Sequence, residues 1–223
     1  YIGGHGTTIG GGIIDSGKFN WLKHASQHPT FNTPDPSYHG AIWSTLVPEA
    51  LGVPIAYALR ARVVLLRDLG AALSPTNAFH LIQGLETLPL RYRAHQENAS
   101  AVAGFLEQHE AVASVNHPSL FTGIQKERAD RYLATGYGPI IGIELKAGIE
   151  AGRKFIDNLK LLYHVANIGD ARSLAIHPAS TTHSQLSEQE QIKAGVTPGY
   201  VRLAIGIEHK DDIIADISQA LAA

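Results

Sequence analysis

Hydrophobic residues recur at two different spacings along this chain of 223 residues. In the first half, residues 57–69 repeat them every three to four positions, which predicts an amphipathic helix, and Gly70 is suited to end it. Ser74-Pro75 then suits the cap and first turn of a second helix that extends to about residue 109. Pro89 is its one strong breaker, so we expect a long helix that is kinked or broken near Leu88-Pro89.

After residue 109 the pattern changes to short runs of Ile, Val and Leu separated by helical segments. We expect strands at 112–118, 139–146, 173–178 and 200–208, and helices at 149–162, 188–194 and 211–221. The helix at 188–194 opens with a capping box formed by Ser187 and Glu190. Strands that alternate with helices predict an α/β or α+β sandwich, with helices on one face of a small sheet.

The N-terminal segment is rich in glycine, which predicts that its backbone closely approaches a ligand or another element. Residues 12–19, GIIDSGKF, nearly match a phosphate-binding loop but have Phe19 where a metal-binding hydroxyl is needed. We therefore interpret Ile13-Ile14 as a strand followed by a turn at Ser16-Gly17. Residues 29–40 contain three prolines and are expected to form an ordered loop.

Arg202 is a candidate binding residue. If 200–208 is a strand, Val201 and Leu203 share one face, and Arg202 shares the other with Ala204 and Gly206. An arginine with such small neighbours has room to bind a carboxylate through two parallel hydrogen bonds. An internal salt bridge or a solvated strand face would produce the same pattern, and the residues alone leave these alternatives open.

Composition excludes several classes of function. The chain has 18 Lys and Arg against 20 Asp and Glu, a net charge of −2, which gives no electrostatic basis for binding nucleic acid or an anionic membrane. It contains no Cys, and no apolar run approaches the ~18 residues of a membrane span. The twelve His residues lack the spacing and nearby carboxylates of a metal site, so we expect no metal. The hydroxyl-rich segment 173–187 is interpreted as turns.

Three further features concern the context of the chain. Charged residues make up only 17%, below the ~25% of an average soluble domain, which suggests a surface covered by other subunits. The N-terminus lacks the basic and apolar regions of a signal peptide, so a cytoplasmic location is expected. The chain contains no Met, and we therefore expect other residues to precede Tyr1.

Five blocks in order along the chain make a specific pattern: YIGGHGTTIGG, PDPSYHG, the QGLETLPLR stretch at 83–99, NIGDARSLAIHPASTTHSQLS and VRLAIGIEH. With these blocks the chain resembles, over nearly its whole length, the second half of the pyridoxal-phosphate (PLP) enzymes of Cys/Met metabolism. Within that family it is most similar to the O-acetylhomoserine sulfhydrylase branch.

The resemblance implies an α/β protein with the PLP-dependent transferase fold type I. It assigns residues 1–70 to the end of the large cofactor domain, 71–109 to a connecting helical region and 110–223 to the C-terminal α/β domain. It also implies pyridoxal 5'-phosphate as the cofactor and a homotetramer as the assembly.

The resemblance further implies a division of the active site. The lysine that forms the Schiff base with the cofactor would come immediately before Tyr1, so no catalytic residue and no identifiable cofactor ligand is expected in this chain. Three residues match substrate-binding positions. Arg202 would hold the substrate α-carboxylate, Thr182 would line the same pocket, and Asn167 would meet the ligand through its side chain or its backbone NH.

The activity that the resemblance implies is a γ-replacement that converts O-acetyl-L-homoserine and sulfide to L-homocysteine and acetate, provided that the missing N-terminal part is present. Sulfide or a thiol would be the second substrate. Methionine γ-lyase and the cystathionine γ-synthase or γ-lyase type share the C-terminal blocks, and they remain an alternative. A non-catalytic α/β fragment is a further alternative, because the Schiff-base lysine is absent from this chain.

Overall fold

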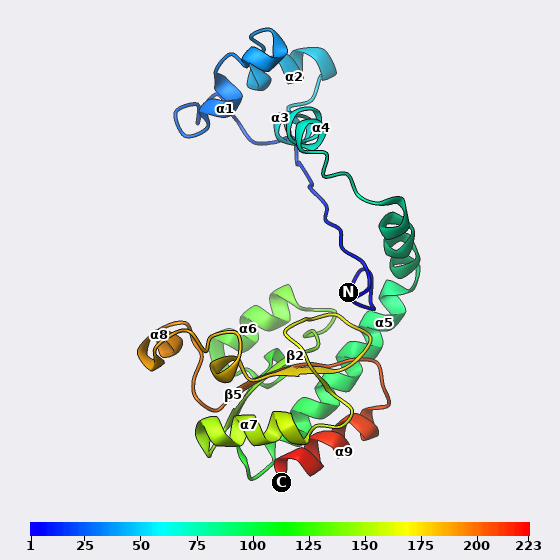
Figure 1. The fold of residues 1–223 in the computed structure, drawn as a ribbon, viewed down its shortest axis with the longest axis vertical. Helices are drawn as coiled ribbons and strands as arrows, with labels where there is room; N and C mark the ends of the chain where they lie inside the picture. Colours follow the sequence, from blue (N-terminus) through cyan, green and yellow to red (C-terminus); the bar gives the residue numbers. More distant parts are fainter. The chain divides into compact units, whose positions relative to one another are not determined.

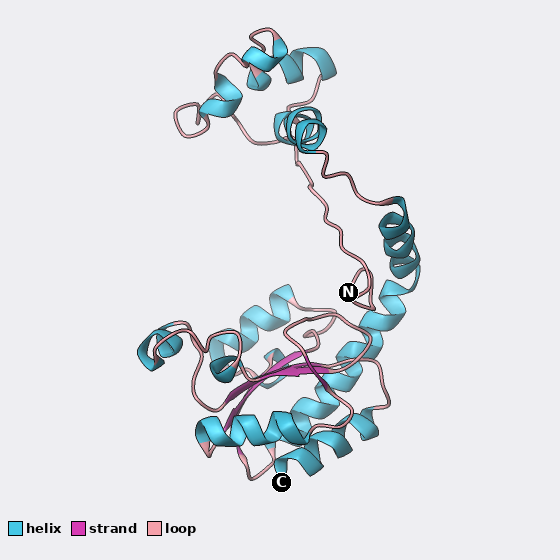
Figure 2. Ribbon diagram, viewed as in Figure 1, coloured by secondary structure: helices cyan, strands magenta, loops and turns pink.

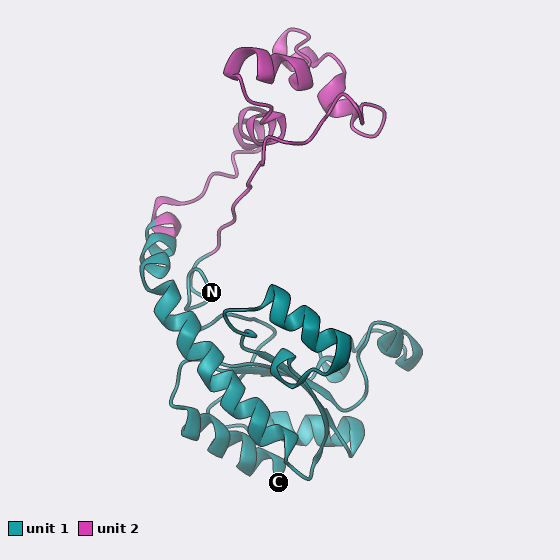
Figure 3. Cartoon of the chain, turned by 180° about the vertical axis from the view of Figure 1, so that it is seen from behind, with its two compact units in different colours: residues 1–8, 79–223 teal, residues 9–78 magenta.

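The computed structural model describes all residues, 1–223, and they form two compact units. The first unit contains residues 1–8 and 79–223, and the second contains residues 9–78 (Figure 3). These units are defined by compactness alone. The assignment of 1–70, 71–109 and 110–223 to parts of a larger enzyme therefore stays a prediction.

A five-stranded sheet organises the first unit (Figure 2). Its spatial order is β1-β2-β5-β4-β3, antiparallel except for the parallel pair β3–β4. The strands are β1 (Val112–Asn116), β2 (Ile140–Leu145), β3 (Tyr163–His164), β4 (Leu174–Ile176) and β5 (Tyr200–Ala204). All four expected strands are confirmed, although β5 ends four residues early. The two-residue β3 was not expected.

Three long helices cover one face of this sheet: α5 (Pro75–Glu107), α7 (Gly148–Asn158) and α9 (Lys210–Leu221) (Figure 1). Their apolar side chains form one buried cluster with alternate residues of β2 and β5: Ala99, Val102, Leu106, Ile141, Ile143, Phe155, Val201, Leu203, Ile213 and Ile217. The predicted sandwich, with helices on one face of a small sheet, is confirmed. The opposite face of β5 carries Arg202.

The expected helices are present with shifted ends. Helix α8 (Glu188–Lys193) has the complete predicted capping box. Helix α7 ends at Asn158 instead of residue 162, because the Asp216 carboxylate accepts hydrogen bonds from the backbone N–H groups of residues 160, 161 and 162 at 2.9, 2.8 and 3.0 Å. Helix α6 (Gly123–Tyr132) was not expected; its sequence is strongly polar and buries only Ala129.

Helix α5 runs for 33 residues through Pro89, so the expected long helix is confirmed and Pro89 does not break it. Proline removes one backbone hydrogen bond, and the remaining bonds, together with the buried face that follows Pro89, keep the helix in one piece. The predicted start is confirmed, since the Ser74 hydroxyl accepts from the Asn77 backbone N–H at 3.4 Å. None of the helices is both long and apolar enough to cross a membrane.

The second unit is helical and small. It contains α1 (Pro29–Asn32), α2 (Trp43–Leu51) and a continuous helical segment made of α3 (Ala56–Arg60), the π-helical η2 (Ala61–Leu66) and α4 (Arg67–Leu69). That segment confirms the helix expected at 57–69, and Gly70 ends it in the left-handed conformation with a φ of 69°. The π turn was not expected.

The strand expected at Ile13-Ile14 is wrong. Both residues are outside any strand, and their side chains are 59% and 97% exposed. No other segment of this chain pairs with them, so their backbone groups have no ladder to join. The turn that follows is present, because the Gly17 N–H donates to the Asp15 carboxylate at 3.0 Å.

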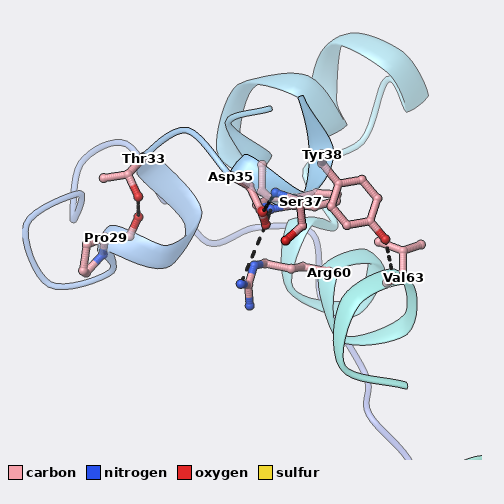
Figure 4. Close-up of polar contacts among 8 residues, drawn as sticks. Pro29, Thr33, Asp35, Ser37, Tyr38, Arg60 and Val63 are labelled. Carbon is pink, nitrogen blue, oxygen red and sulfur yellow. Dashed lines mark hydrogen bonds and ion pairs between the residues drawn. The ribbon is translucent and has the colours of Figure 1, made fainter. Parts of the chain in front are cut away.

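The proline-rich loop at 29–40 is ordered and contains two short helical turns, α1 and η1 (Pro36–Tyr38). Asp35 organises it by accepting from the Ser37 N–H at 3.0 Å and from the Trp43 indole N–H at 2.9 Å. Arg60 lies 3.9 Å from the same carboxylate, and the Tyr38 hydroxyl donates to the Val63 carbonyl (Figure 4). The PDPSYHG block therefore ties the loop to the helical segment that follows.

Candidate active site

Arg202 lies on the sheet face opposite the core, between Gly142 of β2 and Ile176 of β4. Its neighbours Val201 and Leu203 are fully buried on the core face, as predicted. Its Nη2 donates to the Asn167 carbonyl at 3.2 Å, and its Nε is buried with no hydrogen-bond partner. No carboxylate lies within ion-pair distance of the Arg202 guanidinium, so the alternative of an internal salt bridge is excluded. A buried guanidinium donor without a partner suits an anionic ligand.

Asn167 belongs to the loop between β3 and β4, and its backbone carbonyl is the group that meets Arg202. The side chain is exposed. Two residues later, Gly169 has a φ of 78° and lies so close to Tyr1 that an added Cβ would overlap the Tyr1 backbone nitrogen. This close approach requires glycine, and it places the loop directly against the start of the chain.

Thr182 lies apart from this contact. It follows η4 (Pro178–Ser180), is exposed, and its hydroxyl is 2.9 Å from Nδ1 of His183. It makes no hydrogen bond with Arg202 or Asn167. The structure thus brings two of the three predicted residues into contact, and the roles of all three in binding stay predictions.

Tyr1 is part of the same region. Its ring makes edge contacts with Tyr92 and His95, at centroid distances of 5.4 and 5.6 Å. Burial is the main cause that raises the pKa of the Tyr1 hydroxyl to about 12, and the neighbouring Tyr92 adds to it. The positive charge of Arg202 acts in the opposite direction and lowers this pKa. The Tyr1 hydroxyl is therefore neutral at physiological pH and lies within electrostatic range of Arg202.

Two residues of α5 that contact Tyr1 were not singled out from the sequence. Arg91 is 8% exposed and His95 is fully buried, one helical turn apart on the face that packs on the sheet. Nδ1 of His95 lies 2.6 Å from the Ile205 carbonyl, Nε2 has no partner, and burial lowers the pKa of the ring. The available signal was a pair of basic residues, spaced i and i+4, on an otherwise small and apolar helix face.

His177 serves the fold. His177 bridges the Ser180 hydroxyl and the Pro198 carbonyl, both at 2.8 Å, so it holds the hydroxyl-rich segment in its turns. The structure brings together no group of three or more His, Cys, Asp or Glu side chains that could hold a metal ion.

Comparison with known proteins gives concordant matches. A sequence model described as Cys/Met metabolism PLP-dependent enzyme matches residues 1–222. The chain is 52% identical to an O-acetyl-L-homoserine sulfhydrylase of Leptospira meyeri and 49% identical to a homocysteine synthase of Schizosaccharomyces pombe. Each match covers 99% of this chain and 50% of the relative, so the chain spans about half the length of the curated relatives it matches.

A solved structure shares the fold. The crystal structure of a putative O-acetylhomoserine (thiol)-lyase from Campylobacter jejuni, with N'-pyridoxyl-lysine-5'-monophosphate at position 205, is 43% identical and matches with a TM-score of 0.88. The match covers 100% of this chain and 52% of that one, and it confirms the expected α/β class and fold type I architecture. The chain belongs to the family of Cys/Met metabolism PLP-dependent enzymes.

Proposed function

We propose that the gene product containing this chain is a PLP-dependent O-acetyl-L-homoserine sulfhydrylase. In this reaction sulfide forms the new C–S bond at the γ-carbon, the C–O bond of the ester breaks, and acetate leaves as L-homocysteine forms. The names of the relatives at 52% and 49% identity support this substrate pair. The observation that carries the proposal is Arg202, a half-buried arginine whose buried Nε has no hydrogen-bond partner, beside the loop that contacts Tyr1.

The residues present suit the part of such an active site that binds the amino-acid substrate. When bound, the pyridoxal cofactor supplies an electron sink for the carbons of the amino acid. We infer that its lysine immediately precedes Tyr1, and such a lysine would be bonded to the Tyr1 nitrogen that packs against Gly169. The lysine would then lie at the loop whose Asn167 carbonyl holds Arg202.

Arg202 is proposed to hold the substrate α-carboxylate through two parallel charge-assisted hydrogen bonds. The Asn167 carbonyl already fixes one edge of the guanidinium, so the group is oriented before the substrate arrives. A fixed carboxylate orients the α-carbon for proton removal, and the interaction should therefore affect kcat as well as KM. Thr182 is proposed to line the same pocket.

The test is Arg202→Ala in the intact gene product. Loss of the bidentate contact should lower kcat/KM by about 100-fold or more, since several kcal/mol of transition-state stabilisation are removed. Arg202→Lys should recover little, because an ammonium lacks the planar pair of donors. Arg153→Ala is the matched control, an exposed arginine of α7 paired with Glu150 at 2.9 Å. A fall in kcat/KM of less than about threefold for Arg202→Ala would remove this assignment.

A second assay separates the proposed reaction from its alternative. Acetate release from O-acetyl-L-homoserine with sulfide is expected to exceed α-ketobutyrate release from methionine. The reverse order would identify a γ-lyase. Absence of bound cofactor from the intact gene product would instead support the non-catalytic alternative.

We also propose a cytoplasmic homotetramer. The charged fraction of 17% and the exposed apolar side chains of the second unit support a surface covered by other chains. Light scattering of the intact gene product is expected to give four times its subunit mass.

A further inference from the structure

The Arg91 side chain is bound almost entirely to neutral backbone. Its Nη1 donates to the Tyr1 carbonyl at 2.8 Å, and its Nη2 donates to the carbonyls of Gly84 at 2.7 Å and Ile2 at 3.3 Å. Its Nε donates to the Thr87 hydroxyl at 3.1 Å. The arginine thus joins the first two residues of the chain to helix α5.

This use of an arginine demands an explanation, because burying a charge is costly unless its donors are satisfied. Arg91 is 8% exposed and has no carboxylate within ion-pair distance. A purely structural link could be made by a neutral side chain. The planar fork instead reaches two successive carbonyls of the N-terminal segment and two groups of α5 at once, which neither lysine nor glutamine can do.

The same segment is held from its other side. The Ala171 N–H donates to the Gly4 carbonyl at 2.6 Å, and Ala171 follows Asn167 in the loop between β3 and β4. The Ile2 carbonyl lies so close to Gly84 of α5 that an added Cβ there would overlap it. Residues 1–4 are therefore fixed between α5 and the loop that contacts Arg202.

We propose that Arg91 is a positioning residue that sets where the cofactor-bearing lysine stands relative to Arg202. This inference rests on the proposed function, in which that lysine immediately precedes Tyr1. Arg91 holds the Tyr1 and Ile2 carbonyls, while the loop at Asn167 holds the guanidinium that binds the carboxylate. The distance between the lysine and the substrate carboxylate is thereby set by hydrogen bonds at both ends, those of Arg91 at one end and that of Arg202 at the other.

The test uses the intact gene product with Arg91→Ala and Arg91→Lys. Both variants should lower kcat by about tenfold or more while the dissociation constant for L-homoserine, a substrate analogue without the ester, changes by less than about threefold. Arg202→Ala, by contrast, should raise the dissociation constant for L-homoserine by at least about tenfold. Arg93→Ala, an exposed arginine on the same helix, is the control for charge and should change neither quantity.

A second readout is independent of catalysis. Amide hydrogen exchange of the cofactor-free protein should speed up by about tenfold or more in residues 1–8 of both Arg91 variants, with protection of β2 unchanged. Thr87→Val removes the partner of Nε and a 3.5 Å hydrogen bond to the Gly84 carbonyl, and it should give a smaller change in the same direction. A loss of L-homoserine affinity equal to the loss of kcat would overturn the proposal, as would unchanged exchange in residues 1–8. Absence of bound cofactor from the wild-type protein would instead overturn the proposed function. The exchange result would then still test whether Arg91 holds residues 1–4 in place.

Discussion

The two compact units bury their apolar residues to very different extents. The first unit has a continuous core between its sheet and helices α5, α7 and α9. The core of the second unit consists of Trp43, Val47 and Ala56 with partly buried neighbours. On that unit a groove of about 990 Å³ is lined by apolar side chains, among them Ile9, Ile13, Leu65, Leu66 and Leu69.

This difference in buried apolar area indicates that the first unit is the one stabilised mainly by its own core. Apolar burial contributes about 25 cal/mol per Å², so the first unit has most of the stabilisation available to this chain. The second unit leaves Ile14 and Leu69 at 97% and 76% exposed, and its loop relies on polar contacts around Asp35. We therefore expect the second unit to open first and the first unit to respond most strongly to core substitutions.

The largest expected effect is in the core of the first unit. Phe155 is 1% exposed and packs in the cluster beneath the sheet. Phe155→Ala should lower the free energy of unfolding by about 3–5 kcal/mol, because it leaves a large cavity in a close-packed core. Urea unfolding followed by circular dichroism measures this loss. The control is Phe79→Ala, which removes a side chain that is 57% exposed and should change stability little. An equal loss of stability in the two variants would contradict the expectation that the buried core of the first unit supplies most of its stability.

The next effect is the pH dependence of the first unit. Burial lowers the pKa of His117, which is held between the Ser119 hydroxyl and the Gly138 carbonyl. The unfolded chain then binds protons more readily, so this stabilisation is complete above the ordinary histidine pKa of about 6.5 and is lost as the pH falls through the lowered folded pKa. Thermal unfolding between about pH 7.5 and 5 should show this loss. His117→Gln should reduce the slope, and a slope unchanged by this variant would exclude His117 as its source.

The smallest expected effect is in the second unit and at a lower pH. The hydrogen bond from the Trp43 indole is the main cause that lowers the pKa of Asp35, with Ser37 and Arg60 adding to it. The stabilisation from Asp35 is present above the ordinary aspartate pKa of about 3.9 and is lost as the pH falls through the folded pKa. Tryptophan fluorescence should follow this transition, and Asp35→Asn should remove it. Asp68→Asn, at an exposed carboxylate paired with Arg67, is the matched control. If both units lost structure together in the same pH range, the expectation that the second unit opens first would be contradicted.

Local signals were sufficient for many elements. The Ser187–Glu190 capping box, the Gly70 terminus and the two faces of the β5 strand each depend on neighbours close in sequence, and each is confirmed. Ile13-Ile14 has the composition of a strand, but a strand also needs a partner that this chain does not provide. The two-residue β3 is too short to give a periodic pattern.

The site shows the same limit. The orientation of Arg202 followed from strand alternation, whereas its contact with the Asn167 carbonyl depends on a loop 35 residues earlier. The Arg91 contact with Tyr1 spans 90 residues. Arg91 lies in the block at 83–99 that resembles the family, but no neighbouring residue indicates that an arginine inside a helix binds backbone carbonyls at the start of the chain.

We propose that a cofactor-bearing lysine immediately precedes Tyr1 and faces the site that contains Arg202. The most direct measurement is borohydride reduction of the intact gene product, followed by mass spectrometry of its peptides. We expect one pyridoxyl adduct, on a lysine whose next residue is Tyr1. An adduct on Lys18, Lys23 or any other lysine of this chain, or no adduct at all, would contradict it.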